Sequence, residues 1–373
     1  MPVEVTPVRG LRELKAFIDL PYRLHANTQW IPPLKEERYL FLMRRLNSFF
    51  THGDAEYFLA RRGGRVVGRI TAHVDYAYND FHSSRTGMFG FIEFEDDQEI
   101  LEALLASAEA WLRDRAIERM LGPMDFTIND EGGILIDGYE MEPQVRHPWH
   151  PPYYRERIER AGLVKAMDNY SWSLDVSNRD RLDPRLPRIA ERARTKYGVT
   201  IRKMGRRTLR RDLDEFAKVY NAAWAQNWGF VPYSKADLDM YWFDQQLIYS
   251  REWYMVAEID GETVGMAITI PDVAQIYKKM KGHFLPIGWI YYALRHRIID
   301  RLRVGFLGVM PEFEHTGVAA ALYIEHFDVA ERSREKQGEA GFILETNSSM
   351  NRALEAMGGH IVKRWRIYER TLA

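Results

Sequence analysis

The chain contains no cysteine among its 373 residues. A disulfide scaffold, a zinc site built on cysteines and a cysteine nucleophile are therefore excluded. An excess of one charge is also lacking, because 52 Lys and Arg stand against 53 Asp and Glu, for a formal net charge of −1. No overall field therefore draws the chain to nucleic acid or to an acidic partner.

Long hydrophobic runs are missing as well. The first fifteen residues carry charges and no continuous apolar run, so we expect no secretory signal. The longest strongly apolar stretch, 283–294, is too short to span a bilayer. These absences favour the cytoplasm, with the inner face of the membrane as a peripheral location. We expect no metal.

An internal repeat runs along the chain. The segment 57–68 aligns without a gap with 254–265, and each reads as a β-hairpin with a glycine-containing turn. Three further matches follow in the same order: Leu11, Leu14 and Phe17 with Leu209, Leu213 and Phe216; Trp30 with Trp228; and 155–172 with 351–370. Four ordered matches indicate a duplicated domain of somewhat under 200 residues.

The junction between the halves is basic. We place the first domain at 1–175, a basic linker at 176–198 and the second domain at 199–373. Thirteen Lys or Arg face three acidic residues between Arg179 and Arg211. This stretch is either a solvated helix and linker, or a docking stripe for an anionic partner such as an acyl carrier protein, a phospholipid or a tRNA.

Each half has the same expected order of elements. A strand and helices come first, followed by a hairpin, a strand, a long helix, a strand, a helix and a last strand. Mixed strands with helices on both faces indicate an α/β or α+β fold with a mixed central sheet.

The strongest local signal is a strand, loop and helix between residues 303 and 331. An apolar strand, 304–309, ends before Pro311, and a loop with Gly317 precedes a helix rich in alanine. A small-residue loop at a helix start presents unpaired N–H groups to an anion, and the helix dipole adds to the attraction. The sequence therefore predicts an anion site here, without the pattern of a P-loop.

This segment resembles the acyl-CoA pyrophosphate motif of GNAT (Gcn5-related) acyltransferases, usually Val-x-Pro followed by Gln/Arg-x-x-Gly-x-Gly/Ala. Val309, Pro311, Gly317 and Ala319 match it, whereas Glu314 stands where Gln or Arg is usual. Farther on, Asn347 matches the family's asparagine, and Leu354 stands in place of its frequent catalytic tyrosine. The first half has five residues, Glu95-Asp-Asp-Gln-Glu99, at the corresponding helix start and no glycine loop, so we expect it to be degenerate as a cofactor binder.

Nearly the whole chain is similar to the twin-GNAT family called YghO-like, on segments such as Trp30-Ile-Pro-Pro-Leu34, Asn129-Asp-Glu-Gly-Gly133 and 221–232. The resemblance implies a tandem duplicated GNAT-like fold and an N-acyltransferase that uses acetyl-CoA or acyl-CoA as co-substrate. The residues it implies for cofactor binding are Leu307, Gly308, Val309, His315, Thr316, Gly317, Val318, Ala319 and Asn347. Some bacterial ceramide-forming N-acyltransferases are similar in size, which keeps a lipid amine beside a small-molecule amine as the acceptor.

Acyl transfer to an amine needs a base, because the ammonium must lose a proton. The candidates are Asp272, Glu345 and Glu131, while His315 is better suited to contact phosphate. Each carboxylate also has a structural interpretation: a turn residue for Asp272, an exposed strand end for Glu345 and a surface turn for Glu131. The aromatic residues proposed to cover the acceptor, or simply to form core, are Trp224, Trp228, Phe230 and Tyr233.

The segment 276–303 is an insert relative to the first half. It mixes cationic with aromatic side chains, which suits an interfacial helix or a lid over an apolar chain, and equally a plain buried helix. These side chains include Lys278, Lys279, Lys281, Arg295 and Arg297 together with Phe284, Trp289, Tyr291 and Tyr292. Two other functions stay open: an aminoacyl-tRNA-dependent FemX-like transferase, although nucleic acid is the less expected partner, and a non-catalytic acyl-CoA or lipid sensor.

Overall fold

The computed structural model describes residues 1–372, apart from the side chains of residues 244 and 247. It divides into two compact units. The N-unit comprises Met1–Asn169, Ile276–Ala293 and Lys363–Ala373, and the C-unit comprises Tyr170–Gln275 and Leu294–Val362. The division falls inside β7 (Val164–Asp175), α9 (Ala274–Met280) and β13 (His360–Thr371).

The N-unit is built on a mixed sheet in the order β1-β2-β3-β4-β5-β13, with β6 also paired to β13. Its first four strands are antiparallel to one another, and β4 and β5 are parallel. Its elements are β1 (Val3–Pro7), α1 (Gly10–Leu24), α2 (Lys35–Leu42), η1 (Ser48–Thr51), β2 (Gly53–Arg62), β3 (Arg65–Asp75), α3 (Tyr76–His82), β4 (Thr86–Phe94), α4 (Gln98–Arg113), β5 (Arg119–Gly122), β6 (Ile134–Asp137), α5 (Tyr153–Arg160) and α10 (Gly288–Ala293).

The C-unit repeats this plan with the sheet order β8-β9-β10-β11-β12. The first four strands are again antiparallel, and β11 and β12 are parallel. Its elements are η2 (Arg179–Arg181), α6 (Arg185–Tyr197), β8 (Thr200–Lys203), α7 (Leu209–Trp224), α8 (Lys235–Ile248), η3 (Arg251–Trp253), β9 (Tyr254–Ile259), β10 (Glu262–Pro271), α11 (Arg295–Ile298), β11 (Arg301–Val309), η4 (Pro311–Thr316), α12 (Val318–Arg332), β12 (Gln337–Leu344) and α13 (Ser348–Ala356).

The two repeated hairpins form as the sequence predicts. Gly63 and Gly64 join β2 to β3, and Asp260 and Gly261 join β9 to β10, each with a positive φ. Two-residue turns of this kind match the twist of the strands that they connect, and glycine adopts them without steric cost. The matching strand order confirms the tandem α/β fold that the repeat indicates.

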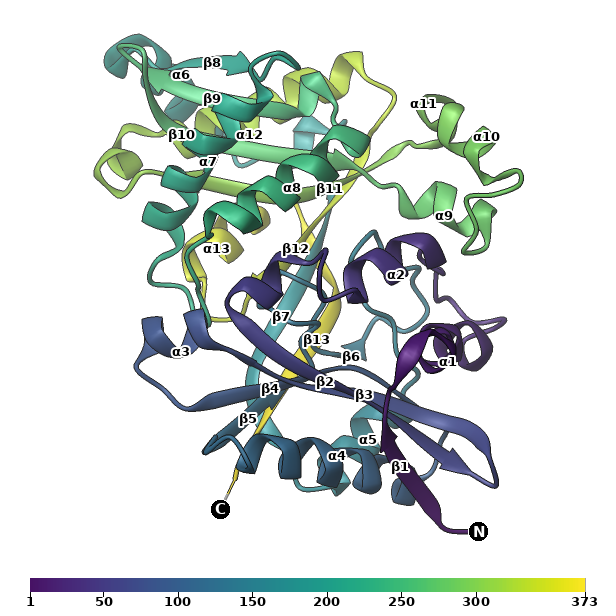
Figure 1. Cartoon of the computed structure of the whole chain (residues 1–373). Helices are drawn as coiled ribbons and strands as arrows, with labels where there is room; N and C mark the ends of the chain where they lie inside the picture. Colours follow the sequence, from purple (N-terminus) through teal and green to yellow (C-terminus); the bar gives the residue numbers. More distant parts are fainter. Residues whose placement is uncertain (373) are drawn as a thin grey trace. The chain divides into compact units, whose positions relative to one another are not determined.

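Helices cover both faces of each sheet (Figure 1). In the N-unit, α4 packs on β2 and β3 through a stripe of buried side chains, and α1 lies over the other face. The stripe consists of Ile100, Leu101, Leu104, Leu105, Ala108 and Leu112, which recur at helical spacing. In the C-unit, α12 packs on β10 and β11 and is itself covered by α6, while α7 packs against the same two strands.

The last strand of each half departs from the expected domain plan. The end of the chain, in β13, belongs to the N-unit and pairs with β5, as in Arg119 with Thr371. The second half of β7 belongs to the C-unit, where Ser171 Oγ donates to Glu339 on β12 at 2.8 Å. Residues 276–293 of the insert also belong to the N-unit, whereas the rest of the insert belongs to the C-unit. The sequence halves 1–175 and 199–373 therefore stay a prediction about the duplicated domains, distinct from the compact units.

The expected basic linker, 176–198, contains η2 and α6. Its cations meet acidic residues of α12: Arg179 pairs with Asp328 and with Glu331, and Arg194 lies 3.6 Å from Glu325. Ala190 and Ala193 of α6 are buried. This segment therefore acts as a packed helix of the C-unit, and part of its positive charge is balanced within that unit.

Candidate acyl-CoA site

Strands β11 and β12 of the C-unit separate after a short parallel pairing. They pair only from Arg301 to Val304, opposite Gln337 to Ala340. The register with β10 shifts at the same point, which leaves Gly305 as a bulge. From Phe306 to Val309, β11 stays paired with β10, and within residues 1–372 no strand pairs with its other edge. The backbone of Leu307, Gly308 and Val309 can thus bond an extended ligand on that edge.

The loop after β11 leads directly into the N-terminus of α12. Gly317 has φ +84° and forms the N-cap of α12 without a side-chain hydrogen bond. A Cβ at Gly317 would lie 2.8 Å from Ile189 Cγ2, so both conformation and space require glycine. Val318 is buried and Ala319 half-buried. Small residues and uncapped N–H groups give this helix start the character of an anion site.

The polar residues of the loop divide into two kinds. Thr316 is buried, and its hydroxyl donates to the Phe313 carbonyl at 2.6 Å, so it stabilises the loop itself. His315 and Glu314 are exposed, with the His315 ring 6.1 Å from that of Tyr197. An exposed Glu314 can turn toward water, which relieves its repulsion of an anion. Of these residues, His315 has the side chain suited to phosphate contact.

Asn347 and Glu345 follow β12. Asn347 is the N-cap of α13, and its Oδ1 accepts from Met350 N at 3.1 Å. Glu345 is half-buried in the turn directly after the strand. Leu354, which stands where GNAT proteins often have tyrosine, is buried in the core. The C-unit therefore brings no acid to that position.

Three of the four predicted acceptor aromatics pack in one cluster against β11. The ring of Trp224 lies 5.0 Å from that of Phe306 on β11, and the rings of Phe230 and Tyr233 lie 5.2 Å and 4.6 Å from that of Tyr220. Trp228 is partly exposed and joins no ring contact described for residues 1–372. The cluster combines core packing with a position beside the open strand.

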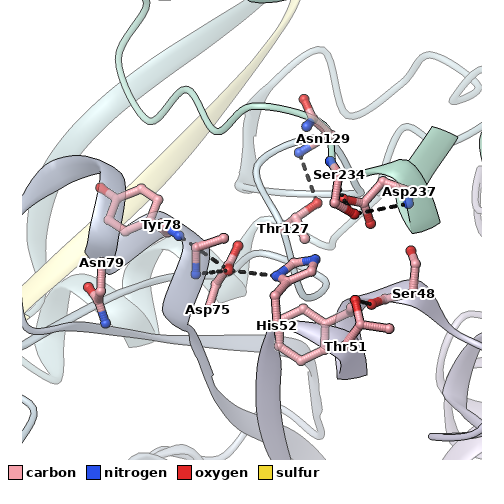
Figure 2. Close-up of polar contacts among 12 residues, drawn as sticks. Ser48, Thr51, His52, Asp75, Tyr78, Asn79, Thr127, Asn129, Ser234 and Asp237 are labelled. Carbon is pink, nitrogen blue, oxygen red and sulfur yellow. Dashed lines mark hydrogen bonds and ion pairs between the residues drawn. The ribbon is translucent and has the colours of Figure 1, made fainter. Parts of the chain in front are cut away.

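Asp272 is fully buried at the start of α9. It forms an ion pair with Arg301 at 3.2 Å, and its Oδ1 accepts from Ala274 N at 3.2 Å. Asp75, its counterpart in the repeat, caps α3 through Ala77 N and Tyr78 N and bonds His52 Nδ1 at 2.9 Å (Figure 2). Both carboxylates thus hold the turn after a hairpin strand, and a base role for Asp272 stays a prediction.

Glu131 lies in the N-unit, in a group of half-buried charges that the sequence did not indicate. It pairs with Arg38 at 2.8 Å, and its carbonyl accepts from Asp125 N at 2.7 Å. Burial, and then the charge of Glu131, raise the pKa of Asp125 to about 8. Neither Arg38 nor Asp125 stands in a recognisable motif, because the loop and helix that bring them together are distant in sequence.

The separation of β4 and β5 in the N-unit is filled by the chain itself. These strands pair only from Thr86 to Met88, opposite Arg119 to Leu121. Beyond that point, Met124 N donates to the Phe89 carbonyl at 2.8 Å, and Phe91 N donates to Asp125 Oδ1 at 2.7 Å. One carbonyl and one N–H group of β4 that an extended ligand could use, those of Phe89 and Phe91, are therefore bonded within the chain.

The start of α4 is likewise occupied by side chains of the N-unit. Asp97 caps the helix by accepting from Glu99 N at 2.9 Å, and Arg62 bonds Asp97 at 2.7 Å and Glu99 at 2.6 Å. The bond from Arg62 lowers the pKa of Asp97, so the cap stays anionic. A carboxylate already occupies the place where a ligand phosphate would bind.

Comparisons with known proteins identify the fold and the family of the chain. No family model matches the chain. Two solved structures share the fold along its length: a tandem GNAT protein from the clavulanic acid biosynthesis pathway (TM-score 0.59, 13% identity, covering 100% of this chain and 99% of that one) and a GCN5-related N-acetyltransferase from Sphaerobacter thermophilus (TM-score 0.55, 13% identity, 99% and 96%). The fold is that of the tandem GNAT proteins.

Two curated relatives identify the family. A bacterial ceramide synthase of Caulobacter vibrioides is 32% identical over 385 residues, covering 99% of this chain and 98% of that protein. Protein YghO of Escherichia coli K12 is 31% identical over 367 residues, covering 96% of this chain and 93% of that protein. The chain belongs to this YghO-like family of tandem GNAT N-acyltransferases.

Within residues 1–372, no helix combines the length and the apolar character that a membrane span requires.

Proposed function

We propose that the chain is an acyl-CoA-dependent N-acyltransferase whose donor site lies in the C-unit. The proposal rests on two features that occur together in the C-unit: β11 has an open edge, and α12 begins without a side-chain cap. In the N-unit, the corresponding groups of β4 and α4 are bonded within the chain. The backbone of Leu307–Val309 would bond the extended arm and polarise the thioester carbonyl. His315 and the first-turn N–H groups of Gly317–Ala319 would hold the pyrophosphate.

The acceptor that we propose is an amine with a long apolar chain. A relative that covers nearly the full length is named a ceramide synthase. The aromatic cluster of Trp224, Phe230 and Tyr233 supplies rings that can cover such a chain. An acceptor of this kind is scarcely soluble, so it would be collected from a bilayer or a carrier protein.

We propose Glu345 as the general base, directly or through a water molecule. It is half-buried at the end of the strand that diverges from β11, so it combines access with a fixed position. Asp272 is fully buried beside Arg301, so an incoming ammonium would reach it less readily than the half-buried Glu345.

The donor site is tested at Ala319. An Ala319→Asp substitution sets a carboxylate at the first turn of α12, which suits the helix dipole but repels a pyrophosphate. We expect the affinity for acyl-CoA, measured by titration calorimetry, to fall by about 10- to 100-fold. Ala319→Asn, of the same shape without charge, should lose clearly less. Equal affinity in wild type and Ala319→Asp would move the site elsewhere.

The same protein distinguishes the alternative functions. Wild type incubated with acyl-CoA and a panel of amines should give acylated product by mass spectrometry. CoA binding without product over the whole panel would favour a sensor. Salt-sensitive binding of aminoacyl-tRNA, with transfer from it, would favour a FemX-like transferase.

A further inference from the structure

The insert contains an exposed apolar tip in the N-unit. The tip, residues 283–290, leaves Leu285, Ile287, Trp289 and Ile290 exposed at 66%, 60%, 50% and 40%. Elsewhere in the described part of the chain, large exposed apolar side chains stand mostly as isolated positions. Four within six residues form a local apolar surface.

The base of the insert is anchored to the N-unit. Ile276 and Met280 are buried, Tyr277 OH donates to Glu37 at 3.1 Å, and the Gly282 carbonyl accepts from Lys35 N at 3.0 Å. Gly282 has φ +81°, and a Cβ there would lie 2.4 Å from the ring of Tyr22. The tip is thus held by its base, while its apolar side chains face outward.

The tip also has a fixed local shape. Trp289 N donates to the Phe284 carbonyl at 3.0 Å, and its indole Nε1 donates to the Pro286 carbonyl at 3.0 Å. The indole N–H is therefore satisfied within the tip, which leaves the ring as an apolar surface.

The charged residues of the segment that carries the tip are all basic, because no Asp or Glu occurs between residues 273 and 299. Lys279 and Lys281 are exposed beside the tip and His283 is exposed within it, whereas Lys278 is paired with Glu142 at its base. Apolar side chains with a tryptophan, flanked by lysines, match the boundary between the headgroups and acyl chains of an anionic bilayer.

We propose that the tip 283–290 docks the protein on an anionic membrane surface. Leu285, Ile287, Trp289 and Ile290 enter the interface, and Lys279 and Lys281 lie at the level of the lipid phosphates. The docking rests on the proposed function for its purpose, which is access to a long-chain acceptor, but the surface itself is defined independently of catalysis.

The experiment is vesicle sedimentation of the full chain. Wild type should sediment with vesicles of phosphatidylcholine and phosphatidylglycerol at low salt, and be released at high salt or with phosphatidylcholine alone. Ile287→Ser combined with Trp289→Ser should lower the vesicle partition coefficient about tenfold, as should Lys279→Gln combined with Lys281→Gln. Leu46→Ser, at a position in the same unit that is 57% exposed, should bind as wild type.

Several outcomes would overturn the proposal. These are wild type remaining in the supernatant at low salt, equal binding by all variants, or a dimer in light scattering that the tip variants make monomeric, since a second copy would then cover the tip. The single variant Ile287→Ser is measured as well, in case the double variant does not fold, and circular dichroism checks the fold of each variant. Transfer to a water-soluble amine should be unchanged in the tip variants. Absence of transfer by wild type to every amine tested, long-chain amines included, would refute the proposed function and leave the vesicle result standing.

Discussion

The N-unit and the C-unit carry five strands in the same order and directions, yet they treat the gap between the fourth and fifth strands differently. In the C-unit, β11 keeps an open edge and α12 begins at a glycine. In the N-unit, Asp125 bonds the N–H of Phe91 in the gap and Asp97 caps α4. Two acidic side chains of the N-unit thus stand at the positions that correspond to the donor site proposed for the C-unit, so we infer that a duplicated fold can keep its frame without keeping such a site.

The largest expected effect concerns Glu345, the base that we propose for the C-unit. Glu345→Gln removes the proposed base, so kcat should fall by about 10²- to 10⁴-fold in a transfer assay. The affinity for acyl-CoA should stay unchanged, because the substitution leaves the α12 start intact. Glu355→Gln, at an exposed position on α13, is the matched control and should retain full activity. Unchanged kcat in Glu345→Gln would exclude it as the base.

The second prediction concerns Asp272, the counterpart of Asp75. Asp272→Asn removes the charge opposite Arg301, so the free energy of unfolding should fall by about 2–3 kcal/mol in a denaturant titration. This estimate is at the lower end for a buried pair because Arg301 is 28% exposed. Asp75→Asn should be destabilising in the same direction. A stable Asp272→Asn protein with a large loss of kcat would instead make Asp272 catalytic.

The smallest expected effect tests the closed helix start in the N-unit. Asp97→Ala removes the cap of α4, so the free energy of unfolding should fall by about 0.5–2 kcal/mol. The affinity for acyl-CoA, which we assign to the C-unit, should not change. Tighter or additional CoA binding in this variant would mean that the N-unit retains a donor site which Asp97 blocks.

The parts of the fold that the sequence predicts are those determined by local chemistry. Glycine turns such as Gly63-Gly64 specify hairpins, and Gly317 before an alanine-rich segment specifies a helix start without a side-chain cap. Both depend on residues within a few positions of one another, so a pattern along the chain reveals them.

The parts that the sequence did not predict depend on distant segments. The end strands β7 and β13 are equivalent in the repeat, so their patterns do not reveal that β13 pairs with β5. The docking of the insert depends likewise on bonds between remote segments, such as those from Lys35 N to the Gly282 carbonyl and from Tyr277 to Glu37. The partners Arg38 and Glu131 are 93 residues apart, and neither belongs to a spacing that signals an ion pair.

The position of β13 has a consequence for the order of synthesis. Arg119 on β5 bonds Glu369 on β13, 250 residues later, so the N-unit lacks this strand until synthesis has passed through the whole C-unit. Contacts of such separation form slowly, and an unpaired β5 edge is open to wrong partners in the meantime. The N-unit is therefore begun before the C-unit and completed after it, and its incomplete form is the stage most exposed to misassembly.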